Sequence, residues 1–453
     1  MYPPTSVRRL GRLGLTSRST PDRLDRPFED PLLYELFPAL ATNVEWGLER
    51  TERALAMLGD PHRSYASLHV GGTNGKGSVT ATLAAIADAA GHRAGCYVSP
   101  HLVSFRERIL VAGTPLSEDA LREYAAQARD AIATCGLTFF EAVTVLALHC
   151  FAREGAEVAV LEVGLGGRLD ATNVVSPRVS AVTNVAMDHT DYLGDTLMAI
   201  AREKAGIMKR DVPFVTTEAD PRVLALFEKL AVEGGAPLHR VSADAVRNPV
   251  IELDRTSFRL DTRSWGELDV VTPLVGRHQA TNAALAVAVC EHLGEGLKPT
   301  STDLLRGIAA VAHRGRDQIV RLGGRTWLFD VAHNEAGVAS LTDTLDLLEM
   351  PRPLVMVVGV LEDKDWRAML PPLLGRADHG ILTQPPTAPL DRRWDPAVAA
   401  RFVTTTVAPR VIEDFAAALD TAASLAGAGT VVVTGSVHTV GGAMKLLGVA
   451  PLG

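Results

Sequence analysis

The sequence has few cysteines and no pattern that would join them. Its 453 residues include four cysteines, which form no Cys-x-x-Cys pair and have no disulfide-like spacing. They are Cys96, Cys135, Cys150 and Cys290. We therefore expect a reduced, cytoplasmic protein rather than a secreted disulfide scaffold.

Long apolar runs and positive charge are also lacking. No apolar run approaches the roughly 20 residues that a membrane-spanning helix needs. The formal net charge of -8 argues against broad binding to nucleic acid or to anionic membranes. The first 30 residues are rich in Arg, Ser and Pro but lack the apolar core of a secretory signal. We expect a solvated extension at residues 1–30, with a transit-like or regulatory arm as the alternative.

Apolar residues, by contrast, are plentiful enough for two cores. Hydrophobic residues make up 47% of a chain too long for one ordinary core, so two domains are expected. Short apolar runs alternate with helical patterns, which predicts an α/β fold with parallel sheets and βαβ connections. The runs expected as strands buried on both faces are residues 157–163, 180–185, 355–360 and 430–434, and residues 67–70 are a further expected strand that leads into a glycine-rich loop.

A breaker-rich segment at residues 293–302 is the expected domain boundary. It follows a predicted helix over 281–292 and contains Gly294, Gly296 and Pro299. We therefore divide the chain into the extension at 1–30, a first domain at 31–295 and a second α/β domain at 296–453.

The strongest local signal is a glycine-rich loop between a predicted strand and a predicted helix. From residue 71 to residue 78 it reads GGTNGKGS. Glycines let the backbone approach a phosphate closely, the helix N-terminus directs N–H groups at it, and Lys76 adds a positive charge. The strict pattern GxxxxGK[ST] is not met, because Val70 stands at its first glycine and Gly77 separates Lys76 from Ser78. We predict a phosphate-binding loop of a variant class, and a glycine turn without a ligand is the alternative.

Polar residues follow two further predicted strands, at the sheet edge where open α/β sheets bind ligands. Glu162 ends one strand, and a carboxylate there suits Mg²⁺ held against nucleotide phosphates. His189 follows the next strand, where a neutral imidazole can hold a metal or a phosphate, and Lys204 lies on a helix beyond it. From the pattern alone, each has a structural alternative: Glu162 as a surface acid, His189 as a structural histidine and Lys204 as an ordinary exposed lysine.

The C-terminal half offers weaker candidates. Arg314 and Arg316 flank Gly315, and an arginine that reaches across a cleft can neutralise charge on a transferring phosphoryl group. Asp330 ends a predicted strand, where it can accept hydrogen bonds from a ribose or orient that arginine. The charged segment 363–365 is a further candidate without an assigned role, and strand ends commonly carry polar residues for no functional reason.

Eight motifs occur in a characteristic order from about residue 43 to the C-terminus. They are GTNGKGS (72–78), SPHL with a following RERI (99–102, 106–109), TFFEA (138–142), EVGLGGRLDATN (162–173), DHTDYLG (188–194), EKAGI (203–207), GRHQATNA (276–283) and DVAHN (330–334). Together they resemble the folylpolyglutamate synthase/dihydrofolate synthase family of the Mur ligases. The resemblance implies a P-loop-type parallel-sheet ATPase domain that also binds pterin or folate (31–295). It also implies a smaller, Rossmann-like C-terminal domain that binds glutamate (296–453).

The same resemblance implies roles for individual residues. The implied catalytic residues are Lys76, Lys204 and His333, the last at the phosphate or glutamate end of the cleft. The implied ATP contacts are Thr73, Asn74, Gly75, Lys76, Gly77, Ser78, Asn282, Arg316 and Asp330. The implied Mg²⁺ ligands, for two sites, are Ser99, Glu162 and His189, and the implied pterin or folate contacts are Phe139, Asp170 and Arg106. Lys204 is typically carbamylated in the family, which requires an amine whose charged form is disfavoured. Potassium is a further candidate ion.

The sequence departs from the family in two places. The proline that often precedes Gly315-Arg316 is replaced by Arg314, which leaves the choice between the two arginines open. Glu335 replaces the proline that usually follows DVAHN. The first 30 residues have no counterpart.

The implied reaction is ATP-driven amide formation through an acyl phosphate, by a monomer with small-molecule partners. L-Glutamate would be joined to dihydropteroate, to a reduced folate, or to both, and the motifs do not decide between them. The alternatives are a Mur ligase acting on a nucleotide-linked peptidoglycan precursor, a regulatory P-loop NTPase, and a non-catalytic folate- or nucleotide-binding protein.

Overall fold

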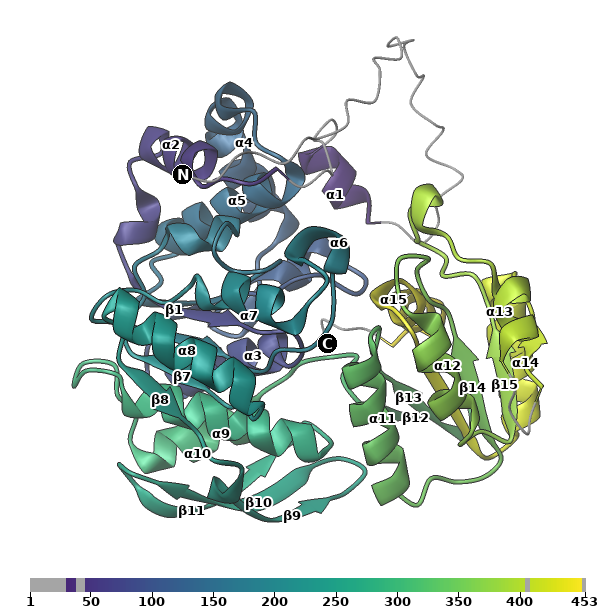
Figure 1. The fold of residues 1–453 in the computed structure, drawn as a ribbon. Coiled ribbons are helices and arrows are strands. Elements are labelled where there is room, and N and C mark those ends of the chain that lie inside the picture. The colour runs from purple at the N-terminus through teal and green to yellow at the C-terminus, as the bar shows by residue number, and fades with distance from the viewer. Residues whose placement is uncertain (1–29, 38–44, 404–407, 450–453) are drawn as a thin grey trace.

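The computed structural model describes residues 30–37, 45–403 and 408–449, which form two lobes (Figure 1). The first lobe runs from the N-terminal side to α10 and contains two sheets, and the second lobe contains one. The extension predicted at residues 1–30 lies outside the described residues except for Asp30.

The first lobe is built on an eight-stranded sheet in the order β4-β3-β2-β5-β1-β6-β7-β8. Its strands are β1 (Ala66–Gly71), β2 (Ala94–Tyr97), β3 (Ile109–Val111), β4 (Thr114–Pro115), β5 (Val158–Glu162), β6 (Val179–Val182), β7 (Phe214–Thr216) and β8 (Leu238–Arg240). The six strands from β2 to β8 pair in parallel, and β3 and β4 add an antiparallel edge. Strands β1, β5 and β6 are buried along almost their whole length, and their sequences are mostly apolar, although His69 in β1 and Ser180 in β6 are buried polar residues.

Helices cover both faces of this sheet (Figure 1). Those of the first lobe are α1 (Pro31–Leu36), α2 (Glu49–Met57), α3 (Lys76–Ala89), α4 (Glu118–Cys135), α5 (Phe139–Arg153), α6 (Thr190–Leu193), α7 (Leu197–Ala205), α8 (Pro221–Gly234), α9 (Arg277–Glu291) and α10 (Ser301–Ala310). Short 3₁₀ turns stand at Pro61–Arg63, Phe105–Arg108, Ala171–Val174 and Ala243–Ala245. Helix α3 is packed between the sheet and the pair α9 and α10, so its small apolar residues are buried.

A three-stranded antiparallel sheet in the first lobe was not expected from the sequence. It consists of β9 (Val246–Ile251), β10 (Thr256–Thr262) and β11 (Gly266–Thr272), in the order β11-β10-β9. Alternate residues of β10, among them Phe258 and Leu260, are buried in the core shared with α9 and α10. The period of two places one face of the sheet against helices and the other in solvent.

The second lobe is a smaller α/β unit. Its sheet has the order β12-β13-β17-β14-β15-β16, and only β12 pairs antiparallel to its neighbour. The strands are β12 (Gln318–Leu322), β13 (Arg325–Phe329), β14 (Leu354–Val358), β15 (His379–Leu382), β16 (Arg410–Val411) and β17 (Thr430–Thr434). The helices are α11 (Glu335–Leu347), α12 (Trp366–Leu374), α13 (Pro396–Phe402), α14 (Phe415–Ala426) and α15 (Val437–Leu446), with a 3₁₀ turn at Leu390–Arg392. Both lobes therefore confirm the predicted α/β class.

Helix α10 packs against the first lobe rather than the second. A Cβ atom on Gly307 would lie 2.4 Å from Cα of Ile86, so α10 and α3 are in backbone contact. Arg306 also donates a hydrogen bond to the carbonyl of Ala89. Because α10 lies beyond residue 295, we propose that the boundary between the domains lies between Ala310 and Gln318, later than the sequence suggested.

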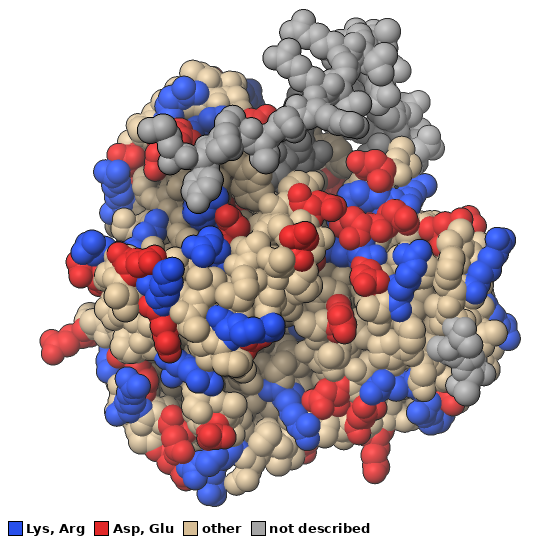
Figure 2. All heavy atoms as spheres, viewed as in Figure 1, with Lys and Arg blue, Asp and Glu red and all other residues tan. Residues whose placement is uncertain are grey.

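Charged side chains lie on the surface, and the cysteines lie in the interior. On the face drawn in Figure 2, acidic and basic side chains are interspersed over both lobes. All four cysteines are buried and carry free thiols. Within residues 30–37, 45–403 and 408–449, no helix is long and apolar enough to cross a membrane.

Candidate active site

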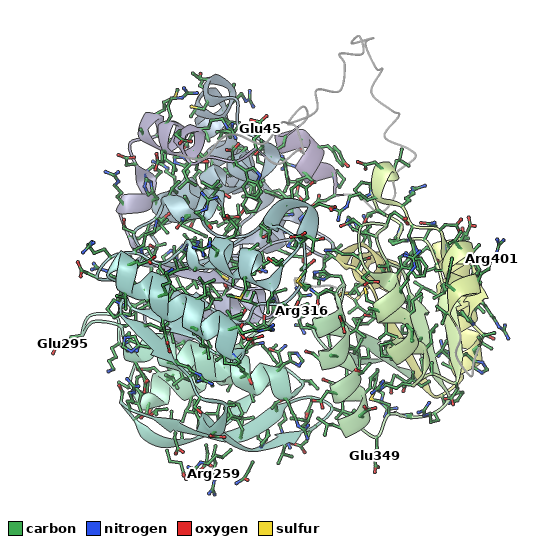
Figure 3. All side chains as sticks on the ribbon, viewed as in Figure 1. Glu45, Arg259, Glu295, Arg316, Glu349 and Arg401 are labelled. Atoms are coloured by element: carbon green, nitrogen blue, oxygen red, sulfur yellow. The ribbon has the colours of Figure 1, made fainter. Side chains whose placement is uncertain are left out.

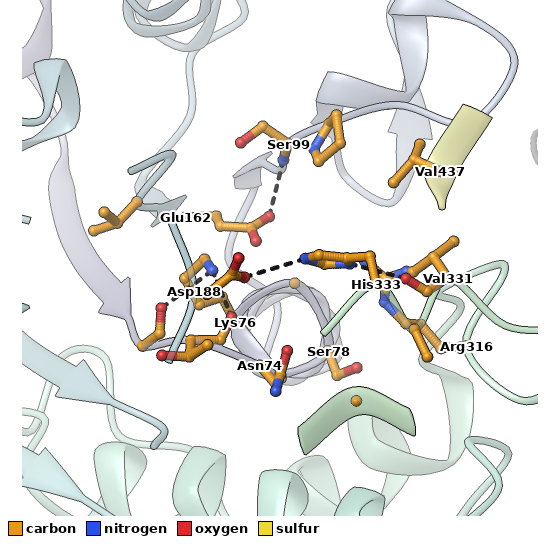
Figure 4. Close-up of a pocket in the computed structure, with 18 of the residues that line it drawn as sticks. Asn74, Lys76, Ser78, Ser99, Glu162, Asp188, Arg316, Val331, His333 and Val437 are labelled. Atoms are coloured by element: carbon orange, nitrogen blue, oxygen red, sulfur yellow. Dashed lines mark hydrogen bonds and ion pairs between the residues drawn. The ribbon is translucent and has the colours of Figure 1, made fainter. Parts of the chain in front are cut away.

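A pocket lies where the carboxyl ends of β1, β5 and β6 face the second lobe. In the sheet register Val70 pairs with Glu162 and Gly71 with Val182, so the segments that follow these strands emerge side by side. The second lobe contributes Arg316, which lies between the two lobes in Figure 3. Figure 4 shows the pocket with the first turn of α3 at its base. Residues far apart in the chain therefore meet at one sheet edge, as open α/β folds predict.

The glycine-rich loop has the geometry of an anion cradle. Gly75 has φ 84° and immediately precedes α3, so the N–H groups of Lys76, Gly77 and Ser78 have no acceptor within the helix. A Cβ atom on Gly75 would lie 2.4 Å from Oδ1 of Asn282, so only glycine fits there. The buried Oγ of Ser78 has no hydrogen-bond partner among the described residues. An unpaired hydroxyl and three free amides suit phosphate oxygens.

Neighbouring segments hold the loop in place. Asn184, after β6, accepts hydrogen bonds from the backbone N–H of Thr73 (2.8 Å, to its carbonyl) and of Asn74 (2.9 Å, to its side chain). Lys76 turns back on the loop, and its Nζ donates to the carbonyls of Gly72 (3.1 Å) and Thr73 (3.0 Å). The ammonium group of Lys76 therefore lies at the loop, and a bound phosphate can replace these carbonyls as its hydrogen-bond acceptor.

Ser99, Glu162 and His189 line the same pocket. Glu162 is 4% exposed, and its Oε2 accepts a 2.9 Å hydrogen bond from the backbone N–H of Ser99. Burial raises the pKa of Glu162, and the charge of Lys76 opposes the shift. Desolvation and the charge of Lys364 lower the pKa of His189 although its side chain is 37% exposed, and the neutral imidazole is able to bind a cation.

These residues fit Mg²⁺ only in the company of a nucleotide. No group of three His, Cys, Asp or Glu side chains in the described part of the chain could hold a metal alone. A hydroxyl, one carboxylate and one imidazole leave most of an octahedral shell to phosphate oxygens and water. Mg²⁺ is commonly bound in this way, with few protein ligands beside the substrate phosphates.

Lys204 is a buried amine beside the loop. It is 5% exposed, and its Nζ donates a 2.7 Å hydrogen bond to the carbonyl of Gly72. Burial, together with the nearby charge of Lys76, lowers the pKa of Lys204 to about 7. A large share of the amine is therefore neutral near pH 7, which removes the alternative of an ordinary exposed lysine.

Asn282, Arg316 and Asp330 complete the wall opposite the loop. Asp330 accepts 2.9 Å hydrogen bonds from the backbone N–H groups of Asp317 and Ala332, which fix its carboxylate at the end of β13. Burial lowers the pKa of Arg316, and Asp330 partly restores it. Arg314 lines a neighbouring cavity with Leu102 and Glu107 instead, so the geometry favours Arg316 at the nucleotide.

A carboxylate from the first lobe joins the two walls of the cleft. Oδ2 of Asp188 lies 3.3 Å from Nε2 of His333, as Figure 4 shows. The same oxygen accepts a 2.9 Å hydrogen bond from Asn334, and Oδ1 accepts one of 2.6 Å from Lys364. Burial alone would raise the pKa of Asp188, but His333 and Lys364 hold it well below the usual range. Asn334 and Asn74 also exchange side-chain hydrogen bonds of 3.1 and 3.2 Å.

A second cavity opens beside the first and shares the walls formed by Ser99, Pro100, Gly164 and Leu165. Phe139 and Asp170 line it, as predicted, together with Trp46 and Arg108. The guanidinium of Arg108 lies 5.7 Å from the centre of the Phe139 ring. The cavity therefore combines an aromatic face, a cation and a carboxylate.

Arg106 is not brought to this cavity. Its Nε donates a 2.6 Å hydrogen bond to the carbonyl of Leu116, and its Nη2 reaches the carbonyl of Pro115. Arg108, two residues further on, is buried and lines the cavity in its place. The arginine of this motif that lines the second cavity is therefore Arg108, and not Arg106 as the resemblance had implied.

The structure brings three residues into the cleft that the sequence did not single out, and it places Arg108 rather than Arg106 beside the second cavity. Asp188 was noted only as the neighbour of His189, Asn334 as the end of DVAHN, and Lys364 as part of an acidic segment. Each lies in a motif or strand end already noted, but its partner stands in the other lobe. Gln279 and His278, in the motif GRHQATNA, also line the pocket beside Asn282.

Comparisons with known proteins agree with this geometry. The family model described as the Mur ligase middle domain matches residues 70–290, and the one described as the Mur ligase, glutamate ligase domain matches residues 315–437. The dihydrofolate synthase/folylpolyglutamate synthase of Mycobacterium tuberculosis is 34% identical over 470 residues, which cover 95% of this chain and 96% of the relative. The protein of the same name from Escherichia coli is 35% identical over 412 residues, or 89% and 92% of the two chains.

Solved structures resemble the whole molecule. The Mycobacterium tuberculosis folylpolyglutamate synthase complexed with ADP has a TM-score of 0.84 and 33% identity, and the match covers 92% of this chain and 98% of that one. Escherichia coli FolC in complex with DHPP and ADP has a TM-score of 0.80 and 35% identity, with 92% and 97% covered.

Proposed function

The chain belongs to the dihydrofolate synthase/folylpolyglutamate synthase family of the Mur ligases, and from this membership we propose that it is an ATP-dependent ligase. It joins L-glutamate to a pterin-bearing carboxylic acid in folate biosynthesis. The acid is dihydropteroate, a reduced folate, or both. The resemblance and the two-lobed architecture expected from the sequence are confirmed by these relatives and by the solved structures.

One observation carries this proposal: the phosphate cradle and the aromatic cavity share the walls at Ser99, Pro100, Gly164 and Leu165. A ring system held against Phe139 can therefore extend its carboxylate toward a γ-phosphate held by the loop. Bringing the two reactants together in this way can lower the barrier by roughly 7–11 kcal/mol. A regulatory NTPase has no need of the second cavity.

The reaction proceeds in two steps. A carboxylate oxygen of the acid attacks the γ-phosphorus, the bond to the bridging oxygen of ADP breaks, and an acyl phosphate forms. The amine of glutamate then attacks the acyl carbon, loses its proton, and the bond between that carbon and the phosphate oxygen breaks. The products are the amide, ADP and phosphate.

The proposed roles of the chain in these steps follow from charge and enclosure. The loop from Thr73 to Ser78, with Asn282, Arg316 and Asp330, binds ATP, and Lys76 and Arg316 offset the negative charge of the transferring group. Closure of the second lobe excludes water, which would hydrolyse the acyl phosphate. His333 stands at the phosphate or glutamate end of the cleft. Phe139, Asp170 and Arg108 hold the pterin-bearing acid.

The proposed Mg²⁺ ligands are Ser99, Glu162 and His189, with two ions as the resemblance implies and potassium as a further candidate. Bound Mg²⁺ would offset charge on the phosphate oxygens. The proposed carbamylation of Lys204 would turn an amine into a carboxylate beside the loop, and its support is the lowered pKa of this lysine. Bicarbonate should then raise the activity of enzyme prepared without carbon dioxide, and the Lys204→Arg variant should not respond.

The test is ATP- and glutamate-dependent phosphate release by the purified protein, with dihydropteroate and with tetrahydrofolate in parallel. Release with both acids makes the enzyme bifunctional, and release with one names its step. Release with ATP alone would instead support the regulatory NTPase. We further propose a cytoplasmic monomer, which size-exclusion chromatography with light scattering would test.

A further inference from the structure

A buried histidine outside the phosphate loop is linked through one threonine to Asp170, which lines the aromatic cavity. His69 lies in β1 between Leu161 of β5 and Ser180 of β6, and its side chain is fully buried. Its Nε2 lies 2.8 Å from Oγ1 of Thr172, and its Nδ1 has no hydrogen-bond partner among the residues that the structure describes. Burial, with a smaller contribution from Lys209, lowers the pKa of His69 to about 3, so the ring is neutral. The ring therefore carries one N–H.

The hydroxyl of Thr172 links this ring to Asp170. Its Oγ1 lies 2.5 Å from Oδ1 of Asp170, and an ionised carboxylate can only accept. The single hydroxyl proton is therefore donated to Asp170, and Oγ1 must accept the proton on Nε2 of His69. This requirement selects the tautomer of His69 and leaves Nδ1 unprotonated, in agreement with its lack of a partner.

Both carboxylate oxygens of Asp170 accept hydrogen bonds from the protein. Oδ1 also accepts a 3.0 Å hydrogen bond from the backbone N–H of Thr172, and Oδ2 accepts one of 2.8 Å from Leu165. A carboxylate offers about four acceptor sites, so these three hydrogen bonds leave one, on Oδ2, and Asp170 lines the aromatic cavity. The contacts from His69 to Thr172 and from Thr172 to Asp170 therefore fix the orientation of the carboxylate and of its remaining acceptor site.

We propose that His69 is a positioning residue for substrate recognition, which holds Asp170 through Thr172 so that its carboxylate accepts one N–H of a pterin ring, from the exocyclic amino group. The inference rests on the proposed function, because Asp170 contacts the substrate only if a pterin occupies this cavity. A single acceptor site held in a fixed direction distinguishes a ring that carries this amino group from a ring without it. His69 itself touches no substrate.

The experiment compares KM values and substrate preference in four variants. His69→Leu removes the donor, Thr172→Val removes the relay at nearly constant volume, and His69→Gln places an amide nitrogen near the position of Nε2. His149→Leu is the matched control: His149 is also buried, its Nε2 lies 2.9 Å from Gln127, and its Nδ1 likewise has no partner in the described structure. Thermal melting establishes that each variant is folded.

We expect His69→Leu and Thr172→Val to raise the KM for the pterin-bearing acid about tenfold, the effect of one lost hydrogen bond to a charged group. The KM for ATP and for glutamate should stay within about twofold, because the phosphate loop does not depend on this relay. Preference for the acid over its analogue without the exocyclic amino group should fall about tenfold. His69→Gln should recover most of both effects, and His149→Leu should behave as the unmodified enzyme.

Three results would overturn the inference while leaving the proposed function intact. The first is that the single variants His69→Leu and Thr172→Val are folded and active with unchanged KM and substrate preference. The second is an equal rise in the KM for ATP, and the third is a His69→Gln variant as impaired as His69→Leu, since each of these would indicate a general packing defect. Should His69→Leu fail to fold, Thr172→Val carries the same test. An unmodified protein that neither binds nor ligates a pterin-bearing acid would overturn both the function and this inference.

Discussion

Asp188 of the first lobe and Lys364 of the second form a buried ion pair across the cleft, with Oδ1 and Nζ 2.6 Å apart. Their side chains are 7% and 8% exposed, so neither charge is solvated by bulk water. The same carboxylate accepts a hydrogen bond from Asn334 and lies 3.3 Å from Nε2 of His333, so three side chains of the second lobe meet one acid. Removing one partner of a buried pair leaves an uncompensated charge, which typically costs about 3–5 kcal/mol. This pair should therefore influence how the lobes close.

Lys364→Met should favour an open cleft. The expected result is a larger radius of gyration in small-angle scattering without ligands and a lower kcat, because closure then leaves Asp188 without its strongest partner. Arg392→Met, in the neighbouring exposed pair with Asp363, is the control and should change neither quantity, since exposed pairs contribute about 0–1 kcal/mol. A Lys364→Met protein as compact and active as the unmodified enzyme would contradict this role.

Lys76→Met should leave the fold intact and remove ligation. Loss of one preorganised charge at a transferring group typically lowers kcat by about 10²–10³. Phosphate release and thermal melting would measure the two effects, with Lys229→Met on the exposed face of α8 as the control. Normal turnover by a folded Lys76→Met variant would refute the phosphate-loop assignment.

Lys204 should make the protein more stable as pH rises above 7. Its folded pKa of about 7 lies below the ordinary 10.5, so between these values the unfolded chain binds the extra proton. The free energy of unfolding should increase by about 1.4 kcal/mol per pH unit within this window, which is roughly 3 kcal/mol between pH 7.5 and 9.5. Urea unfolding at pH 7.5 and 9.5, in buffers free of carbon dioxide, would measure the increase.

The matched variant for that measurement is Lys204→Met, which has no proton to bind. Its stability should change less between the two pH values than that of the unmodified protein. An identical pH dependence in both proteins would show that other groups are responsible.

Arg108→Met and Arg106→Met should separate the two arginines of one motif. Arg108 lines the aromatic cavity, so its loss should raise the KM for the pterin-bearing acid about tenfold or more. Arg106 hydrogen-bonds to Leu116 and Pro115, so its loss should cost about 1 kcal/mol of stability and leave KM within about twofold. The reverse pattern in steady-state kinetics would restore the original assignment of Arg106.

Arg316→Met should weaken ATP binding more than Arg314→Met, because only Arg316 lines the pocket with the phosphate loop. Calorimetric titration with a non-hydrolysable ATP analogue would compare the two dissociation constants, and a difference of about tenfold or more is expected from a lost charge-assisted hydrogen bond. Equal dissociation constants would show that the pocket geometry does not distinguish Arg316 from Arg314 at the nucleotide.

Much of the fold and the phosphate loop could be predicted because the determining forces are local in the chain. A strand buried on both faces needs a mostly apolar sequence, and β5, β14 and β17 have one. The turn at Gly75 needs a residue that tolerates φ 84°, and the helix after it needs no distant partner to present its N–H groups. The alternating strands of the small antiparallel sheet were missed although their pattern is also local.

Side-chain direction and long-range pairing were decided only by the tertiary structure. Arg106 and Arg108 stand two residues apart in a 3₁₀ turn with three residues per turn, so they point in different directions, and the motif alone does not tell which one meets the cavity. Asp188 and Lys364 are 176 residues apart, and their pairing depends on how the lobes pack. The same holds for Lys204, whose lowered pKa results from burial. Sequence therefore determined the secondary structure and the anion cradle, which depend on neighbouring residues. The packing of distant segments determined which charges are buried, paired and turned toward the substrates.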